Sequence, residues 1–475
     1  GVGVGFDTLG AGKISIKEPE WSEETWNVPD DREGWCESVQ ILLDGFFFGQ
    51  KVPKFDYSEI RPYGAPIKGF GGTSSGYKPL KELHDDLTEL YNNMIGKEID
   101  STTIVDTENL IGKCVVAGNV RRSAALALGA HDDMKYLSMK NDQEKLYSHR
   151  WGSNNSFHAH VGMDYTWHSE QSQKNGEPGY IWLNNAKTRG RMKDGYRDDD
   201  INVAGFNPCV EQQLEDAELC CLVETFPAKH DDYEDYLRTL KIAYMYGKTV
   251  TLVNTHWPET NGIMLKNRRI GLSQSGVVQA FNKHGRRQLY DWCDNAYEEV
   301  KKLDKGYSDW LCVPRSVRMT SIKPSGTVSL LNGSTPGIHF PEAEFYIRRI
   351  RFSADSDLLK TIGEHGFKIE DDEYSPNTKV VEFPIHEPYF EKGKKDVSIW
   401  EQLEIAAQYQ HYWADNSVSI TCTFQPEEAK DIKSALEMYE TRLKAVSFLR
   451  YQETGYKQAP YEPITKEEYE EMSLG

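Results

Sequence analysis

The chain has 475 residues, 38% of them hydrophobic and 12% aromatic, which is enough to bury one large α/β barrel or two to three ordinary domains. Its 55 basic and 74 acidic residues give a net charge of −19, which argues against nucleic acid as a partner. No apolar run approaches the ~20 residues of a membrane helix, and eight irregularly spaced cysteines do not suggest a secreted disulfide framework, so we expect a cytoplasmic protein without signal peptide or membrane segment.

The chain opens with a glycine-rich run, Gly1 to Asp7, that looks like a phosphate loop at first sight. Phe6 and Thr8 occupy the third-glycine position in the two possible registers of the G-x-G-x-x-G pattern, so a dinucleotide-binding fold is disfavoured. Apolar residues at helical spacing then predict a helix through residues 39–46, and residues 52–60 predict a strand.

A stretch rich in glycine and serine, residues 61–76, precedes an amphipathic helix. Leucines at spacings of three and four run from Leu80 toward Met94, with Gly96 after the end of the pattern. Such a stretch is most often a linker, but free backbone amides before a helix also suit an anion.

Two adjacent arginines, Arg121 and Arg122, follow a second helix that we expect to end near Gly118. An arginine pair of this kind is usually solvated, so the residues alone do not assign it a function.

Residues 150–161 predict a strand on which His158 and His160 share one face. Two histidines on one face could bind a metal, but the sequence places no third ligand. We therefore expect a plain polar face and no metal site. Residues 176–183 predict a turn followed by a buried strand.

The segment 207–227 (NPCVEQQLEDAELCCLVETFP) is the most informative part of the chain. The proline after Asn207 favours an extended conformation, in which side chains at i, i+2 and i+4 point to one side. We therefore expect Asn207, Cys209 and Glu211 on one face, which places an amide, a thiol and a carboxylate in a row.

Each of these features also has an ordinary explanation. A single cysteine most often packs as a small hydrophobe, and an Asn-Pro step starts many turns. A zinc site would need CxxC spacing or a histidine, and the segment has neither. The combination is less ordinary, because a thiol flanked by an amide and a possible base is followed by two further thiols, Cys220 and Cys221.

A helix is predicted over residues 233–246, followed by Gly247-Lys248-Thr249 and a strand over residues 250–253. The triplet resembles part of a P-loop, but Ile242 stands where the first glycine is required. The order of helix then strand is also the reverse of a P-loop, so we reject that interpretation.

The segment Ser321–Leu331 contains a Pro-Ser-Gly-Thr turn before an apolar run. Free N–H groups and hydroxyls at such a turn can hold phosphate, and an ordinary N-capped helix explains the pattern equally well. Later residues predict strands over 380–383 and 417–424, a helix with a capping box at Ser398 to Glu401, and a helix with an apolar stripe over 432–446. The alternation of strands and helices favours a parallel α/β fold.

Several motifs spread over nearly the whole chain resemble one family, the ribonucleotide reductases: GTSSG, VVAGNVRRSA, MKNDQEKL, SNN, NPCVE, RRIG, KPSGTV, RIRF and QAP. The resemblance is closest to the adenosylcobalamin-dependent (class II) reductases of the monomeric ribonucleoside-triphosphate type. It implies one catalytic domain over residues 1–475, a ten-stranded α/β barrel whose central finger loop, about residues 205–222, carries the radical cysteine in a dry interior.

The resemblance also implies roles for individual residues. Cys209 would be the thiyl-radical cysteine that removes the 3′-hydrogen of the ribose, Glu211 the base on the 3′-hydroxyl, and Asn207 a hydrogen-bonding partner of the sugar hydroxyls. Cys220 would be one thiol of the pair that reduces the substrate. The phosphates of the substrate would be bound by Lys323, Ser325, Gly326 and Thr327. The loops that respond to an allosteric effector would contain Lys68, Arg121 and Arg122.

These residue types suit the implied chemistry. Sulfur can carry a radical and exchange hydrogen with carbon, a neighbouring carboxylate can take a proton, and a dithiol supplies two electrons by closing a disulfide.

The sequence lacks the motifs of two other reductase classes, and this indicates the radical source. Reductases that use a di-iron partner carry a Tyr-Tyr pair on a late barrel strand, and the corresponding residues 417–424 contain none; the chain end shows no glycyl-radical motif. We therefore expect adenosylcobalamin as cofactor. The implied partners are a ribonucleoside triphosphate substrate, a dNTP effector and thioredoxin or a similar dithiol, with the protein a monomer or a dimer.

The chain starts at Gly1 inside a glycine-rich run, so we expect a fragment. The partner thiol of Cys220 would precede Gly1, and shuttle cysteines would follow Gly475, so the chain alone should bind nucleotide without turnover. The alternatives are an inactive or regulatory nucleotide-binding relative, a reductase of another radical class, a carboxylate-based hydrolase and a zinc-binding scaffold.

Overall fold

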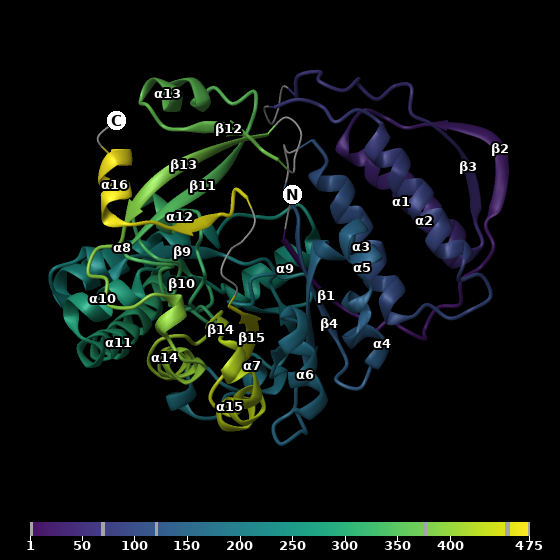
Figure 1. The fold of residues 1–475 in the computed structure, drawn as a ribbon. Helices are drawn as coiled ribbons and strands as arrows, with labels where there is room; N and C mark the ends of the chain where they lie inside the picture. The colour runs from purple at the N-terminus through teal and green to yellow at the C-terminus, as the bar shows by residue number, and fades with distance from the viewer. Residues whose placement is uncertain (1–2, 68–71, 119–121, 374–377, 452–456, 474–475) are drawn as a thin grey trace. The chain divides into compact units, whose positions relative to one another are not determined.

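The computed structural model describes residues 3–67, 72–118, 122–373, 378–451 and 457–473. The chain divides into two compact units, residues 1–157 and 158–475, and both contain strands and helices (Figure 1). None of the helices in these described ranges is long and apolar enough to cross a membrane.

The first unit contains two parallel strand arrangements: β4 pairs with both β1 and β5, and β2 pairs with β3. Its strands are β1 (Gly3–Asp7), β2 (Glu20–Asn27), β3 (Lys51–Asp56), β4 (Ala124–Gly129) and β5 (Ser153–His158). Its helices are α1 (Arg32–Phe48), α2 (Lys78–Asn92), α3 (Ser101–Val116), α4 (Met134–Leu137), α5 (Gln143–Ser148) and the 3₁₀ segments Met139–Asn141 and Arg150–Gly152.

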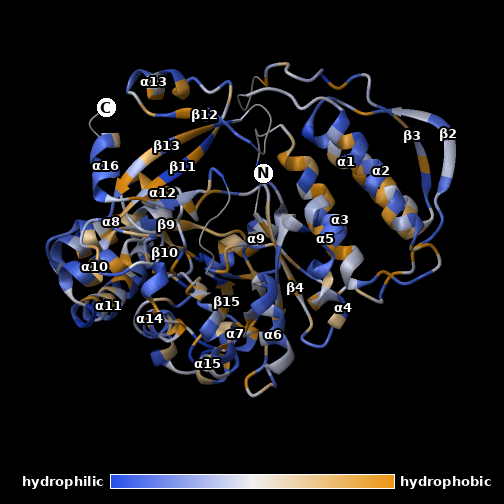
Figure 2. Cartoon of the chain, viewed as in Figure 1, coloured by the Kyte–Doolittle hydropathy of each residue, from blue (hydrophilic) through white to orange (hydrophobic). Residues whose placement is uncertain are grey.

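Capping and amphipathic spacing explain the helices of this unit. Asp31 and Asp100 cap α1 and α3, because their carboxylates accept from the backbone N–H three residues on, at 2.7 and 2.8 Å. Leu80, Leu83 and Leu87 of the predicted stripe are buried, and Leu90 and Met94 are partly buried. Apolar and polar residues alternate along α1 and α2 in Figure 2.

The second unit contains four groups of strands. β15 (Ala445–Arg450) lies between β6 (Gly179–Ile181) and β14 (Thr421–Phe424). β9 (Leu222–Thr225) pairs in parallel with β10 (Gly271–Gln274), and parallel bridges join Leu272 to Thr320 and Ile322 to Val418. β7 (Val203–Phe206) and β8 (Gln213–Glu215) form an antiparallel hairpin. An antiparallel sheet has the order β12-β13-β11-β16: Ile369–Asp371, Thr378–His386, Phe345–Ser353 and Tyr461–Pro463.

Helices surround and connect these strands. They are α6 (Thr166–Asn175), α7 (Leu183–Thr188), α8 (Tyr233–Val250), α9 (Pro258–Asn267), α10 (Val277–His284), α11 (Arg286–Leu311), α12 (Val328–Leu331), α13 (Leu358–Glu364), α14 (Ile399–Tyr412), α15 (Ile432–Tyr439) and α16 (Lys466–Ser473). The 3₁₀ segments are Met192–Asp194, Pro227–Lys229, Lys394–Asp396 and Pro426–Asp431. The mixture of parallel strands and helices confirms the predicted α/β class.

The predicted strand over residues 250–253 is wrong, because α8 continues through Gly247 and Lys248 to Val250. Lys248 is fully buried, and its Nζ donates to Asp304 Oδ1 at 2.9 Å and to Ser316 Oγ at 3.0 Å. This tertiary anchoring extends the helix beyond the point where the local pattern ends it.

Two other boundaries also differ from prediction. α15 ends at Tyr439, and Val446, expected on the same helical stripe, lies in β15. β5 ends at His158, so His160 lies beyond the strand on which both histidines were expected.

Candidate active site

Residues 207–212 of the segment predicted to carry the chemistry form the turn of the β7–β8 hairpin, and Cys220 and Cys221 lie between β8 and β9. Asn207 N donates to Gln212 O at 3.1 Å, and Gln212 N donates to Asn207 Oδ1 at 3.0 Å, so the asparagine side chain helps to close the turn. Val210 has a φ of +63°, in the left-handed region that a β-branched residue rarely adopts.

The predicted extended conformation is therefore wrong, and the reason is the chain reversal at Val210. The turn buries Asn207 at 4% and Glu211 at 0% relative exposure but leaves Cys209 exposed. The three side chains do not lie in the predicted row, and the dry setting expected for Cys209 is not formed by the residues that the structure describes.

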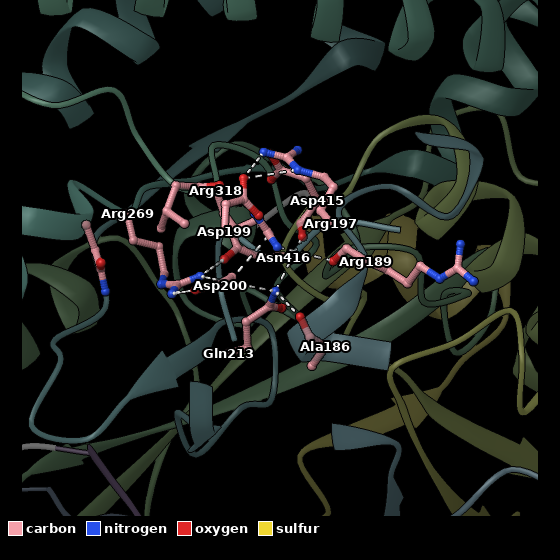
Figure 3. Close-up of polar contacts among 12 residues, drawn as sticks. Ala186, Arg189, Arg197, Asp199, Asp200, Gln213, Arg269, Arg318, Asp415 and Asn416 are labelled. Carbon is pink, nitrogen blue, oxygen red and sulfur yellow. Dashed lines mark hydrogen bonds and ion pairs between the residues drawn. The ribbon is translucent and has the colours of Figure 1, made fainter. Parts of the chain in front are cut away.

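A network of buried charges holds the base of the hairpin (Figure 3). Arg269 is fully buried and contacts Asp200, which precedes β7, through Nη2–Oδ1 at 2.6 Å and Nη1–Oδ2 at 2.9 Å. Its Nε donates to Oε1 of Glu218, which follows β8, at 3.0 Å. Burial alone would lower the pKa of Arg269, but the two carboxylates raise it, so the guanidinium stays charged. Gln213 on β8 adds a bond to the Ala186 carbonyl at 3.1 Å.

Glu211 forms an ion pair with Lys323, with Oε1 3.0 Å from Nζ. Its other oxygen, Oε2, is buried and has no hydrogen-bond partner in the described part of the chain. Burial lowers the pKa of Lys323, but Glu211, Cys209 and Cys220 raise it more strongly. The pair therefore leaves one Glu211 oxygen without a hydrogen bond among the described residues, and a carboxylate oxygen can accept a proton.

Cys209 and Cys220 lie near these charges. Both are exposed, yet the protein around each sulfur removes enough water to raise the pKa of the thiol, and Glu211 raises it further. Lys323 opposes both effects. A raised pKa keeps both thiols protonated at neutral pH, which suits transfer of a hydrogen atom better than thiolate attack.

Cys221, the third thiol of the segment, packs in the protein interior. It is buried, its backbone N–H donates to Gln212 Oε1 at 3.1 Å, and its thiol contacts the Gly247 carbonyl at 3.6 Å. Burial raises the pKa of Cys221 to about 11, as expected for a packed cysteine.

The predicted phosphate segment lies directly after Lys323. Two of its amides are not free, because Ser325 N donates to Lys323 O at 2.9 Å and Gly326 N to Pro324 O at 2.8 Å. Thr327 precedes α12 without a capping hydrogen bond from its side chain, so the ordinary N-capped helix is not formed either. Thr327 is exposed, Ser325 is buried, and a Cβ on Gly326 would meet no atom within 4 Å.

Glu224 on β9 is a titratable residue near Glu211 and Lys323 that the sequence motifs did not predict. Its Oε1 accepts from Ser275 Oγ at 2.7 Å and from Ser273 Oγ at 3.1 Å. Burial, and to a smaller extent Glu211, raise the pKa of Glu224 to about 7, although both serines and Lys323 oppose this shift. The signal in the sequence was an acidic residue directly after the apolar pair Leu222 and Val223, four positions after Cys220.

Two of the predicted effector residues, Lys68 and Arg121, lie outside the described residues. Arg122 is described and exposed, and it belongs to the first unit, whereas the residues discussed above belong to the second.

A solved structure of a class Id ribonucleotide reductase α subunit from Actinobacillus ureae superposes with a TM-score of 0.53 at 14% identity, over 94% of this chain and 85% of that chain. This likeness places the chain in the fold class of ribonucleotide reductases and shows no more than the fold. A crystal structure of a B12-dependent (class II) ribonucleotide reductase matches far better, with a TM-score of 0.88 and 35% identity over 99% of this chain and 75% of that chain.

Sequence comparisons identify the class of ribonucleotide reductase to which the chain is similar. Residues 9–91 match the family model "B12-dependent ribonucleotide reductase, insertion domain". A probable adenosylcobalamin-dependent ribonucleoside-triphosphate reductase of Dictyostelium discoideum is 48% identical, over 99% of this chain and 65% of that protein. The Lactobacillus acidophilus adenosylcobalamin-dependent ribonucleoside-triphosphate reductase is 39% identical, over 97% of this chain and 68% of its own length. The chain thus spans about two thirds of these relatives, and it belongs to the adenosylcobalamin-dependent ribonucleotide reductase family, as its motifs predict.

Proposed function

We propose that the chain carries the catalytic part of a ribonucleoside-triphosphate reductase that makes 2′-deoxyribonucleoside triphosphates for DNA synthesis. The observation that carries the proposal is the ion pair between the buried Glu211 and the half-buried Lys323, whose charges act on both Cys209 and Cys220. Membership of the family and the names of its relatives supply the substrate class.

Adenosylcobalamin is the proposed cofactor, and when bound it supplies the radical. The residues present fit this group, because Cys209 is exposed to an incoming reactant and its raised pKa keeps a hydrogen atom on the sulfur. Cys209 would face the cofactor, and no other residue is assigned to its binding.

The proposed roles of the site residues follow from their free atoms. The Cys209 sulfur, once it has lost its hydrogen atom, removes the hydrogen at C3′ of the ribose. Glu211 accepts the proton of the 3′-hydroxyl through Oε2, the oxygen not used by Lys323. Asn207 donates to the sugar hydroxyls through Nδ2, since its Oδ1 is occupied by the turn.

Reduction of the sugar requires two electrons, and we assign one of the two thiols to Cys220. Its partner thiol and the shuttle cysteines are proposed to lie in the part of the protein outside residues 1–475, with thioredoxin or a similar dithiol as the final reductant.

The remaining assignments concern binding and architecture. Lys323, Ser325, Gly326 and Thr327 are proposed to hold the substrate phosphates, and Lys68, Arg121 and Arg122 to respond to a dNTP effector. The parallel bridges that extend the β9–β10 pair support a single ten-stranded barrel around a finger loop of residues 205–222, the region that contains the hairpin turn. A cytoplasmic monomer or dimer is proposed.

The test uses the full-length parent protein with adenosylcobalamin, a ribonucleoside triphosphate, a dNTP effector and a dithiol. Deoxynucleotide formation and the cob(II)alamin spectrum are followed in the wild type and in Cys209→Ser. We expect product from the wild type and none from the serine variant, while nucleotide binding is retained in both. Deoxynucleotide made by Cys209→Ser would contradict the thiyl mechanism, and binding without turnover by the wild type would favour a regulatory relative.

A further inference from the structure

Glu224 accepts two hydrogen bonds from serine hydroxyls beside the proposed substrate site. A serine hydroxyl has one hydrogen, and Ser273 and Ser275 both donate theirs to the same oxygen of Glu224, Oε1. Each hydroxyl can then act only as an acceptor toward other groups. Ser273 Oγ accepts from the backbone N–H of Lys323 at 2.9 Å, and Ser275 Oγ accepts from that of Gly337 at 3.0 Å.

These two amides are the two ends of one loop, Lys323–Gly337, which contains the residues proposed to bind phosphate. The ends also touch each other, because a Cβ on Gly337, whose φ is +53°, would lie 2.8 Å from the Lys323 carbonyl oxygen. Gly337 is held further by Val277, whose N–H donates to its carbonyl at 3.2 Å. The two ends of the loop therefore lie together, and Ser273 of β10 and Ser275 just after β10 hold them.

The charges around Glu224 make this anchor part of the catalytic region. Glu224 interacts electrostatically with Lys323, Glu211 and Tyr236, which face it from three other segments. Its second oxygen, Oε2, makes no hydrogen bond to any residue that the structure describes. A single carboxylate oxygen thus accepts from both of the hydroxyls that contact the two ends of the loop.

We propose that Glu224 is a positioning residue that holds the substrate-phosphate loop Lys323–Gly337 in place through Ser273 and Ser275. It acts through the two hydroxyls and does not touch the substrate. This inference rests on the proposed function, because it assumes that the loop binds the triphosphate.

The proposal makes a specific demand on the chemistry at position 224. Glutamine keeps an oxygen where Glu224 has Oε1, so it can accept from both serines without a negative charge. Alanine removes the group that accepts from both hydroxyls, so that neither hydroxyl is oriented toward its backbone amide. Loss of one ordinary hydrogen bond weakens an equilibrium about threefold to tenfold.

The experiment measures the dissociation constants of CTP and of inorganic tripolyphosphate by calorimetry, on the full chain, with unfolding temperature as a check of the fold. We expect Glu224→Ala to weaken both ligands about tenfold and Ser273→Ala and Ser275→Ala about threefold each. Glu224→Gln should rescue affinity to within about twofold of the wild type. Glu234→Ala, which removes an exposed carboxylate on α8, is the matched control and should bind as the wild type does.

Coupling between the residues gives the sharpest test. If Glu224 acts through the two hydroxyls, adding Glu224→Ala to the double variant Ser273→Ala/Ser275→Ala should weaken binding no further. Additive losses would overturn the proposal, as would unchanged binding in Glu224→Ala or equal losses in the alanine and glutamine variants. A wild type that binds neither probe would instead refute the proposed function, so the two failures are distinguishable.

Discussion

The reactivity of Cys209 and Cys220 depends on two charges with opposite effects. Burial is the main cause of the raised pKa of both thiols, and Glu211 adds to it while Lys323 reduces it. Because Glu211 and Lys323 are also paired with each other, removal of either one exposes both thiols to the full effect of the other.

Alkylation rates should reveal this arrangement. Glu211→Gln should lower the pKa of both thiols and accelerate their reaction with iodoacetamide at pH 8 about threefold, whereas Lys323→Met should slow it about threefold. Mass spectrometry of the alkylated peptides measures each site, with the exposed Cys36 of the first unit as internal reference. A change in the same direction for both variants would contradict the assigned charges.

At the residue scale, the sequence indicated which residues lie near one another better than how they are arranged. Asn207, Cys209, Glu211 and Lys323 are close together in the structure, and their roles stay predictions. The prediction of a row of side chains is wrong because the sequence pattern contains no sign of a left-handed conformation at Val210. Valine normally favours strands. The Glu211–Lys323 contact joins positions that are far apart in the chain, and no local rule predicts it.

At the scale of the element, the β7–β8 hairpin depends on charges more than on its strands. Its strands have four and three residues, too short to be stable alone. Arg269 provides the missing support by binding carboxylates on both sides of the hairpin base. The turn that carries Cys209 is therefore positioned from its base.

Replacement of Arg269 should test this dependence. Arg269→Leu leaves Asp200 and Glu218 buried without their common partner, which should cost about 3 to 5 kcal/mol of unfolding free energy. Urea unfolding measures the loss, and Arg238→Leu, which breaks an exposed pair with Asp235, should cost less than about 1 kcal/mol. A loss below about 1 kcal/mol in Arg269→Leu would show that the hairpin does not need the ion pairs of Arg269 with Asp200 and Glu218.

Elements with a strong period were predicted well, and elements decided by tertiary contacts were not. The α2 stripe and the capping residue Ser398 of α14 match the structure. α8 continues past its predicted end because Lys248 finds a buried carboxylate at Asp304, and that contact is invisible to a local pattern.

At the scale of the molecule, the α/β class followed from the alternation of elements, whereas the division into two compact units did not. The first unit has its own core of buried apolar residues from Ile16 to Leu110. His84 lies beside this core and is almost fully buried, with Nε2 3.0 Å from Ser38 Oγ and Nδ1 2.7 Å from Tyr57 OH. Because Ser38 donates to the Trp35 carbonyl, its oxygen accepts from Nε2–H, and the neutral ring accepts from Tyr57.

This histidine should make the chain sensitive to acid. Burial, with a smaller contribution from Lys81 and against the effect of Asp85, lowers the pKa of His84 from 6.5 to about 4. The unfolded chain therefore binds a proton that the folded chain does not, and stability is lost as pH falls from about 6.5 toward 4, by up to about 3 kcal/mol. Thermal unfolding between pH 7 and 4.5 should show a smaller pH-dependent loss in His84→Gln than in the wild type. The exposed His256→Gln serves as control, and equal slopes in all three proteins would contradict the assignment.

The ion pairs of Arg269 at the hairpin base also limit which substitutions this chain can accept. Arg269 carries one positive charge between the carboxylates of Asp200 and Glu218, and the buried Arg318 also lies 3.5 Å from Asp200. Loss of Arg269 therefore leaves two buried carboxylates short of a partner, whereas loss of one carboxylate still leaves Arg269 paired with the other. A combinatorial library randomised at these positions and selected for folded protein should therefore keep the arginine wherever either acidic residue is kept.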